Sequence, residues 1–214
     1  MTTFSPDYLA GKHFLVTGAS SGIGRATGAL LAACGASVTA SGRDAARLEA
    51  AIAQWPRGGH VAQVQVLQEA DTTAAWVKSL ADAHGAFDGV FHAAGVELIR
   101  PIRLTKQTQL DEVFGSAVYA AAGVARAAAQ KGVLKDEGSL VFMSSVAGSS
   151  GQVGMSAYSA AKAAVDGMVR SLACEFAPRR NRGGRTRGSA PSARSPPPAP
   201  LSPSGGRSSS SSRR

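Results

Sequence analysis

The chain alternates short apolar segments with longer segments in which apolar residues recur at helical spacing. The short segments are rich in β-branched residues and are typical of strands, whereas the longer Ala-rich segments repeat apolar positions every three or four residues, which predicts helices. We expect strands over residues 13–17, 37–41, 61–67, 89–92 and 139–144, and helices over residues 23–34, 45–54, 73–84, 110–131 and 156–177.

The regular alternation of strand and helix predicts the fold class. Strands that are separated by helices of this length form right-handed crossovers, which build a parallel sheet covered by helices on both faces. The uninterrupted apolar run at residues 141–143 fits a strand that is buried on both sides. We therefore predict an α/β fold with a doubly wound parallel sheet.

The net charge of +9 is distributed unevenly along the 214 residues. Residues 1–178 contain 14 basic and 14 acidic side chains, whereas residues 179–214 contain nine arginines and no acidic residue. This second region consists mainly of Arg, Ser, Pro and Gly, so it cannot bury enough apolar surface to offset its ordering entropy. We expect a folded domain over residues 1–178 and a disordered basic tail over residues 179–214.

Other features of the composition exclude several classes of protein. Cys34 and Cys174 are too few for a disulfide framework, and no residues have metal-ligand spacing, so we predict no metal site. No apolar run approaches the roughly 18 residues of a membrane span, and the first 12 residues lack the apolar core of a signal peptide. We expect a cytoplasmic protein without a membrane partner.

A glycine-rich segment joins the first strand to the first helix, and it reads Thr17-Gly18-Ala19-Ser20-Ser21-Gly22-Ile23-Gly24. Gly18 suits a tight turn, Gly22 lets the backbone approach a pyrophosphate, and Gly24 allows the helix to pack closely on the strand. The position between a strand and a helix favours dinucleotide binding over a simple structural turn, with the phosphates at the helix N-terminus. The predicted cofactor contacts here are Thr17, Gly18, Ser20, Gly22, Ile23 and Gly24.

The residues after the second strand bear on the choice of dinucleotide. An acidic side chain at this place binds the ribose of NAD, whereas a nearby arginine accommodates the 2′-phosphate of NADP. Arg43 lies close to the strand end and Asp44 just beyond it, so NADP(H) is favoured over NAD(H). In the alternative interpretation, Asp44 only caps the next helix and Arg43 is a solvated charge.

Three residues near the fifth strand form a candidate catalytic group. Ser145 ends that strand, and Tyr158 and Lys162 lie four residues apart on the following helix, which places them on one face. A neighbouring ammonium group would lower the pKa of the Tyr158 phenol from about 10 toward the working range of an acid or base. Ser145 could donate a hydrogen bond that polarises a substrate carbonyl.

Together these segments resemble the short-chain dehydrogenase/reductase family. The resemblance covers residues 9–178 and rests on residues 17–24, on Ala93-Ala94-Gly95 after the fourth strand, and on the Ser, Tyr and Lys just described. It implies a Rossmann-type fold and reversible hydride transfer between nicotinamide C4 and a carbonyl or secondary-alcohol carbon, as in 3-oxoacyl-acyl-carrier-protein reductases.

The resemblance also implies roles for individual residues. Tyr158 would be the general acid or base, Lys162 would bind the nicotinamide ribose and tune Tyr158, and Ser145 would orient the substrate. Further cofactor contacts implied by the resemblance are Asp71, Ala94 and Gly95.

The chain departs from the family at two positions near the predicted site. His92 stands where the family usually has asparagine, either as a polar residue at a strand end or as a pH-sensitive group. The fourth helix of the family carries a catalytic asparagine, but residues 114–119 contain none, which leaves Ser116 as the candidate to hold a water molecule in its place.

The resemblance ends after Pro178, where the family continues into two further strands. Residues 181–214 contain no β-branched run that predicts a strand, so we expect the sheet to lack its last two strands. A C-terminal truncation caused by a reading-frame shift near Arg180 is one explanation of this difference, and a genuine evolved tail is the other.

Three functions of different class follow from these observations. The first is an NADP-dependent oxidoreductase that acts on a small carbonyl or alcohol substrate, and the second is a truncated, inactive NADP-binding remnant. The third is a nucleic-acid or anion binder that uses the Arg182-Gly183-Gly184-Arg185 segment. We rank it last because the tail lacks the aromatic residues that single-strand binders interleave. The resemblance to the family also makes a homo-oligomer possible, although the absence of the last strands would weaken the association between subunits.

Overall fold

The structure is a computed structural model that describes residues 4–56, 58–179 and 182–188. Within these residues, six parallel strands form one sheet in the order β3-β2-β1-β4-β5-β6. The strands are β1 (His13–Thr17), β2 (Ser37–Gly42), β3 (Val61–Val64), β4 (Phe87–His92), β5 (Leu134–Ser145) and β6 (Arg182–Gly188). The parallel, doubly wound α/β fold is therefore confirmed.

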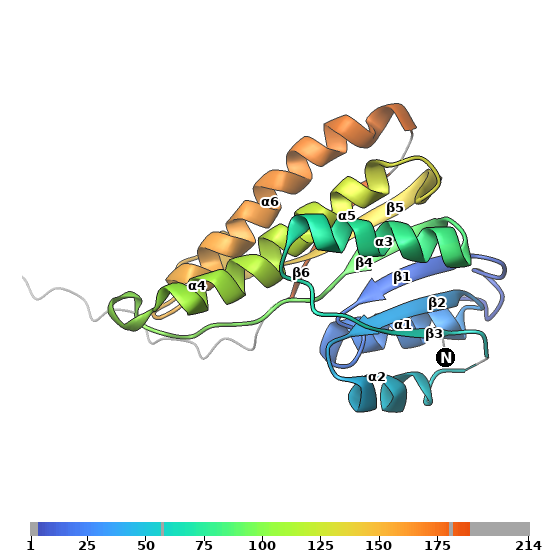
Figure 1. The fold of residues 1–214 in the computed structure, drawn as a ribbon, viewed down its shortest axis with the longest axis horizontal. Coiled ribbons are helices and arrows are strands. Elements are labelled where there is room, and N and C mark those ends of the chain that lie inside the picture. The colour runs from blue at the N-terminus through green and yellow to red at the C-terminus, as the bar shows by residue number, and fades with distance from the viewer. Residues whose placement is uncertain (1–3, 57, 180–181, 189–214) are drawn as a thin grey trace, which may run out of the picture.

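Helices cover both faces of the sheet. The helices are α1 (Gly22–Ala33), α2 (Ala45–Ile52), α3 (Ala70–His84), α4 (Gln107–Phe114), α5 (Ala120–Ala129) and α6 (Ser156–Phe176). Figure 1 shows α3, α5 and α6 over one face of the sheet and α1 and α2 over the other. Within the described residues, no helix is both long and apolar enough to cross a membrane.

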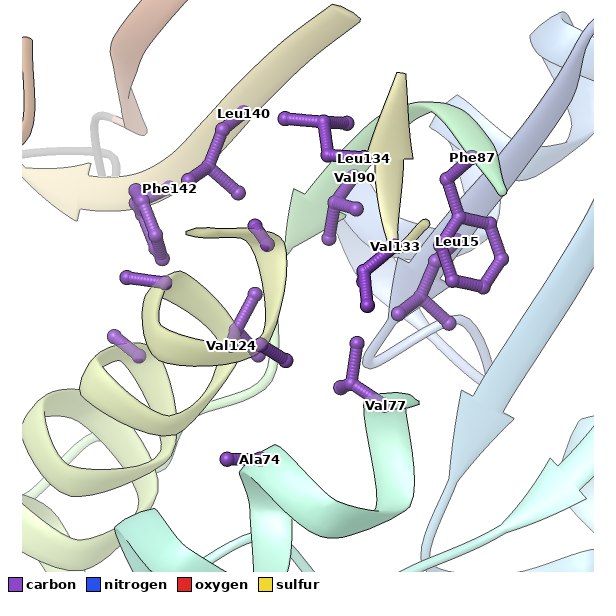
Figure 2. Packing of buried hydrophobic residues seen from close by; sticks show 14 of the residues in the cluster. Leu15, Ala74, Val77, Phe87, Val90, Val124, Val133, Leu134, Leu140 and Phe142 are labelled. Carbon is purple, nitrogen blue, oxygen red and sulfur yellow. The ribbon is translucent and has the colours of Figure 1, made fainter. Parts of the chain in front are cut away.

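The buried residues form separate clusters on the two faces because successive side chains of a strand point in opposite directions. Leu15 belongs to the larger cluster, where it meets Phe87 and residues of α3 and α5 beneath the helices (Figure 2). The next residue, Val16, belongs to the cluster on the other face, together with Leu48 of α2. Alternate residues of β1 therefore anchor helices on both sides of the sheet.

Helix α1 is in direct contact with the aromatic ring of Trp55, which follows α2. A Cβ atom added at Gly28 would lie only 2.3 Å from a carbon of the Trp55 indole, so a glycine is required for this approach. Trp55 is 7% exposed and also meets the His60 ring edge-on at a centroid distance of 5.5 Å. The contact fixes α1 against the segment that follows α2.

The single helix expected over residues 110–131 is interrupted in the structure. A π-helical segment, Gly115–Tyr119, separates α4 from α5. The hydroxyl group of Ser116 donates a hydrogen bond to the Glu112 carbonyl at 2.8 Å, and such side-chain bonds compete with the regular helical ladder. Segments of this kind occur often at functional sites, and this one lies beside the candidate site described below.

The expectation that no strand follows residue 181 is wrong for residues 182–188. These residues form β6, which pairs in parallel with β5 from Ser139↔Arg182 to Ser145↔Gly188. The edge of β5 offers backbone donors and acceptors, and any extended segment without proline can pair with them whatever its side chains. The sheet therefore has its sixth strand, and the described residues contain no seventh. The rest of the expected disordered tail, residues 180–181 and 189–214, lies outside the described residues, and the domain boundary at residue 178 stays a prediction.

Candidate active site

A cavity of about 520 Å³ opens where the strand order reverses between β1 and β4. Its walls come from the loop after β1, the end of β2, the residues after β3 and the segment after β4. Crevices at such reversal points, beside the carboxyl ends of parallel strands, are the usual ligand sites of open α/β sheets. The predicted cofactor loop after β1 therefore lies at the usual ligand site of such a sheet, together with residues that follow β2, β3 and β4.

The glycine-rich loop forms one wall of the cavity as bare backbone. Gly18 has a φ of 68°, and a Cβ atom there would lie 2.8 Å from the Ala94 nitrogen. A Cβ atom on Gly24 would lie 2.3 Å from the Gly18 carbonyl oxygen. No side chain caps the N-terminus of α1, so the N–H groups of its first turn are open to an anion. The loop therefore has the geometry of a phosphate cradle.

Two arginines lie at another part of the same cavity. Arg43 and Arg47 both line it, and guanidinium groups are well suited to bind a phosphate. The Asp44 side chain accepts a hydrogen bond from the Arg47 backbone nitrogen at 3.0 Å, so Asp44 is the N-cap of α2. Arg47 was not singled out from the sequence, although its four-residue spacing from Arg43 was a usable signal.

The structure does not bring Asp71 to the cavity. Helix α3 begins at Ala70, earlier than predicted, so Asp71 lies in its first turn, where its side chain is 86% exposed and forms an ion pair with Arg126. The cavity wall after β3 is formed instead by residues that include Leu67 and Gln68. Leu67 and Gln68 were not identified from the sequence as wall residues, because their place beside the cavity depends on where α3 begins.

The remaining predicted cofactor contacts lie at the cavity or support it. Ala94 and Gly95 line it directly, next to the glycine loop. Thr17 is buried behind them, and its hydroxyl group accepts a hydrogen bond from the Ala94 nitrogen at 3.3 Å. The predicted contacts that line the cavity are Gly18, Ser20, Gly22, Ile23, Gly24, Arg43, Ala94 and Gly95.

A second cavity of about 250 Å³ adjoins the first. Ser145 and Tyr158 line it, together with residues of the turn before α6 that include Gln152 and Met155. Three residues contribute to the walls of both cavities, and they are Ile23, Glu97 and Met143. The candidate catalytic residues therefore lie directly beside the candidate cofactor cavity.

Ser145, Tyr158 and Lys162 come together as the spacing predicts. The Lys162 ammonium nitrogen lies 5.6 Å from the centroid of the Tyr158 ring, and the phenol is hydrogen-bonded to Ser145. Lys162 donates its own hydrogen bond to the Met143 carbonyl at 2.9 Å. The lysine is thus anchored on β5 next to the tyrosine.

The expected lowering of the Tyr158 pKa is not found. Burial raises the pKa of the Tyr158 phenol, the hydrogen bond with Ser145 opposes this effect, and the negative charge of Glu97 adds to it. Lys162 faces the ring and donates to a backbone carbonyl, and its own pKa is lowered to about 8, mainly by burial. Tyr158 is therefore a protonated phenol at neutral pH, which makes it a proton donor.

His92 is a buried neutral side chain in this site. Its Nδ1 atom is hydrogen-bonded to the Thr17 hydroxyl group at 2.9 Å, and burial, with a smaller effect from Lys162, lowers its pKa to about 4. Of the two interpretations of His92, the structure favours the polar residue at a strand end, because the ring stays uncharged near neutral pH. Ser116, the other departure, lines the larger cavity from the π-helical segment.

Comparison with known proteins gives consistent matches. Residues 12–182 match the family "short chain dehydrogenase". The 3-oxoacyl-acyl-carrier-protein reductase FabG of Vibrio harveyi is 31% identical over 173 residues, which cover 80% of this chain and 70% of that protein. A tropinone reductase homologue of Arabidopsis thaliana is 32% identical over 177 residues, covering 79% of this chain and 65% of that protein. The matched region thus spans about two thirds of the length of these relatives.

Solved structures resemble the fold over most of its length. A short chain dehydrogenase from Salmonella enterica superimposes with a TM-score of 0.79 at 29% identity, covering 88% of this chain and 80% of that one. A protein from Shigella flexneri whose structure contains NADP superimposes with a TM-score of 0.78 at 28% identity, covering 86% of this chain and 80% of that one.

Proposed function

The chain belongs to the short-chain dehydrogenase family, and we propose that it is an NADP(H)-dependent oxidoreductase that interconverts a small carbonyl compound and a secondary alcohol. The observation that carries this proposal is the common wall of the two cavities. It joins a phosphate cradle to a pocket lined by a serine hydroxyl and a protonated phenol, with the ammonium group of Lys162 buried beside the phenol ring.

The larger cavity fits a nicotinamide dinucleotide. The closely packed glycines and the uncapped start of α1 suit its pyrophosphate, and Arg43 with Arg47 suits a 2′-phosphate. The NADP complex of the Shigella relative supports the same cofactor for this chain. When bound, the cofactor would supply the hydride for reduction or accept it in oxidation.

The residues of the smaller cavity supply the proton and orient the substrate. In the direction of reduction, Ser145 and Tyr158 donate hydrogen bonds to the carbonyl oxygen, which polarises the carbonyl. The Tyr158 hydroxyl group then gives its proton to this oxygen as it gains negative charge. The phenolate forms beside the ammonium group of Lys162, whose nitrogen lies 5.6 Å from the centroid of the ring.

Oxidation of NADPH in the presence of small ketones and 3-oxoacyl thioesters tests the proposal. Removing the Tyr158 hydroxyl group with Tyr158→Phe should lower kcat at least about 100-fold, since a general acid contributes this much or more. Tyr8→Phe, at an exposed tyrosine, is the matched control and should keep wild-type kcat.

Thermal stabilisation by NADPH, measured on the same proteins, tests the cofactor cavity separately. We expect the melting temperature to rise with NADPH in the wild type and in both variants. Turnover that survives Tyr158→Phe unchanged would refute the role of Tyr158. Stabilisation by NADPH with no turnover of any substrate would instead support the inactive NADP-binding alternative.

A further inference from the structure

Glu97 occupies an unusual place in the wall between the two cavities. It follows β4, its side chain is exposed, and it lines both the cofactor cavity and the smaller Tyr158 pocket. In the described part of the chain, its carboxylate has no hydrogen-bond or ion-pair partner. Within these residues, the negative charge is therefore hydrated by solvent and is not paired.

Within the part of the chain that the structure describes, Glu97 is also the only acidic or basic residue that lines the smaller pocket. The other lining residues are apolar or neutral polar, and they are Ile23, Met143, Ser144, Ser145, Val146, Ala147, Gln152, Met155 and Tyr158. Lys162 lies behind this wall, buried and bonded to the Met143 carbonyl. Among the described residues, the charge that a substrate in this pocket would meet is therefore the negative charge of Glu97.

The charge of Glu97 reaches the reacting end of the pocket. Glu97 and Tyr158 line the same small pocket, and the negative charge of Glu97 helps to raise the pKa of the Tyr158 phenol, which is the group that would touch the substrate carbonyl. A charged substituent on the substrate would experience the same field.

We propose that Glu97 selects substrates by charge, favouring carbonyl compounds that carry a protonated amine and disfavouring those that carry a carboxylate. The inference rests on the proposed oxidoreductase function, which it deepens by naming a class of substrate. Because the carboxylate is exposed and screened by water and salt, the expected effect is about fivefold for each unit charge, well below that of a buried pair.

Three ketones of nearly equal size measure this selection. They are 4-methylcyclohexanone, 1-methyl-4-piperidone, which carries a cationic amine at pH 6.5, and 4-oxocyclohexanecarboxylate. At low salt the wild type should show kcat/KM values about fivefold higher for the piperidone than for methylcyclohexanone, and about fivefold lower for the carboxylate.

The variant Glu97→Gln keeps the size of the side chain and removes its charge. We expect the three kcat/KM values to converge in this variant, and to converge partly in the wild type at 0.5 M salt. Glu175→Gln, at an exposed glutamate near the end of α6, is the matched control and should keep the wild-type ratios. If the ratios of the three kcat/KM values are the same in Glu97→Gln as in the wild type, the proposal is wrong.

Binding measurements separate this inference from the proposed function. Calorimetric titration with cyclohexylammonium and with cyclohexanecarboxylate requires no turnover. If no ketone is reduced, the proposed function fails. Tighter binding of the cation that is lost in Glu97→Gln would still support charge selection, and equal affinities for both ligands would refute it.

A different role for Glu97 gives a different result. If the carboxylate acts on the positively charged ring of oxidised nicotinamide, Glu97→Gln should change the ratio of the affinities for NADP⁺ and NADPH. A change in this ratio, with unaltered discrimination among the three ketones, would also overturn the proposal.

Discussion

Replacing Gly24 with alanine is expected to destabilise the fold, although alanine is the better helix former. The added Cβ atom would lie 2.3 Å from the Gly18 carbonyl oxygen and 2.8 Å from its carbonyl carbon. Both neighbours are backbone atoms, so the loop or the helix must move by about 1 Å to restore a normal contact. Overpacking of this kind costs about 1–3 kcal/mol, whereas alanine gains at most about 1 kcal/mol in helix propensity. The net change in the free energy of unfolding should be a loss of about 1–2 kcal/mol.

Gly167 of α6 provides the matched control. A Cβ atom there would come no closer than 3.6 Å to a neighbour, the Arg170 guanidinium group, which is an ordinary contact. Gly167→Ala should therefore show only the gain in propensity, about 0.5–1 kcal/mol. In a domain of this size, 1 kcal/mol shifts the melting temperature by about 2–4 °C, so thermal unfolding followed by circular dichroism resolves the two variants.

The same substitution should therefore have opposite effects at the two positions. The melting temperature should fall in Gly24→Ala and rise in Gly167→Ala. If both variants were stabilised to the same extent, the loop would accommodate a methyl group, and the close approach of α1 to Gly18 would not be a constraint. NADPH should also stabilise Gly24→Ala less than the wild type, because the displaced residues form the cradle.

Two further predictions concern the cofactor and pH. Arg43→Ala should weaken binding of NADPH about tenfold and leave NADH affinity nearly unchanged, because a charged hydrogen bond to the 2′-phosphate is lost. Arg103→Ala, at an exposed arginine, is the control. Equal weakening of the binding of both cofactors in Arg43→Ala would contradict the assignment. His92 has a pKa of about 4 in the folded chain, against 6.5 for the free side chain. Between these two pH values, only the unfolded chain binds the proton. The free energy of unfolding therefore falls as pH falls, by at most about 1.4 kcal/mol per pH unit. His92→Asn should flatten the melting temperature against pH over this window, and parallel curves for the two proteins would refute the argument.

Local patterns were sufficient to predict most of the architecture. Each of the five strands predicted before residue 145 overlaps a strand of the structure, and β1 over residues 13–17 was predicted with its observed bounds. The i, i+4 spacing of Tyr158 and Lys162 is a property of any helix, so their proximity could also be predicted. The glycine loop could be placed because the strand before it and the helix after it were both evident.

The features that were missed depend on tertiary contacts. Strand β6 exists through backbone pairing with β5, and its side chains give no pattern that indicates it. The π-helical segment inserts a local irregularity that apolar spacing does not reveal. The pKa of Tyr158 depends on burial, and Glu97 matters only because two cavities share it. None of these properties can be derived from spacing alone.

The contact between Trp55 and Gly28 gives the protein an intrinsic fluorescent reporter. Helix α1 begins in the glycine loop and passes the Trp55 ring at Gly28, one turn after Gly24. A displacement of α1 therefore changes the surroundings of this buried indole and with them its emission. Trp76, the second tryptophan, packs against the cluster on the opposite face of the sheet, so Trp76→Phe leaves Trp55 as a single optical signal for events at the start of α1.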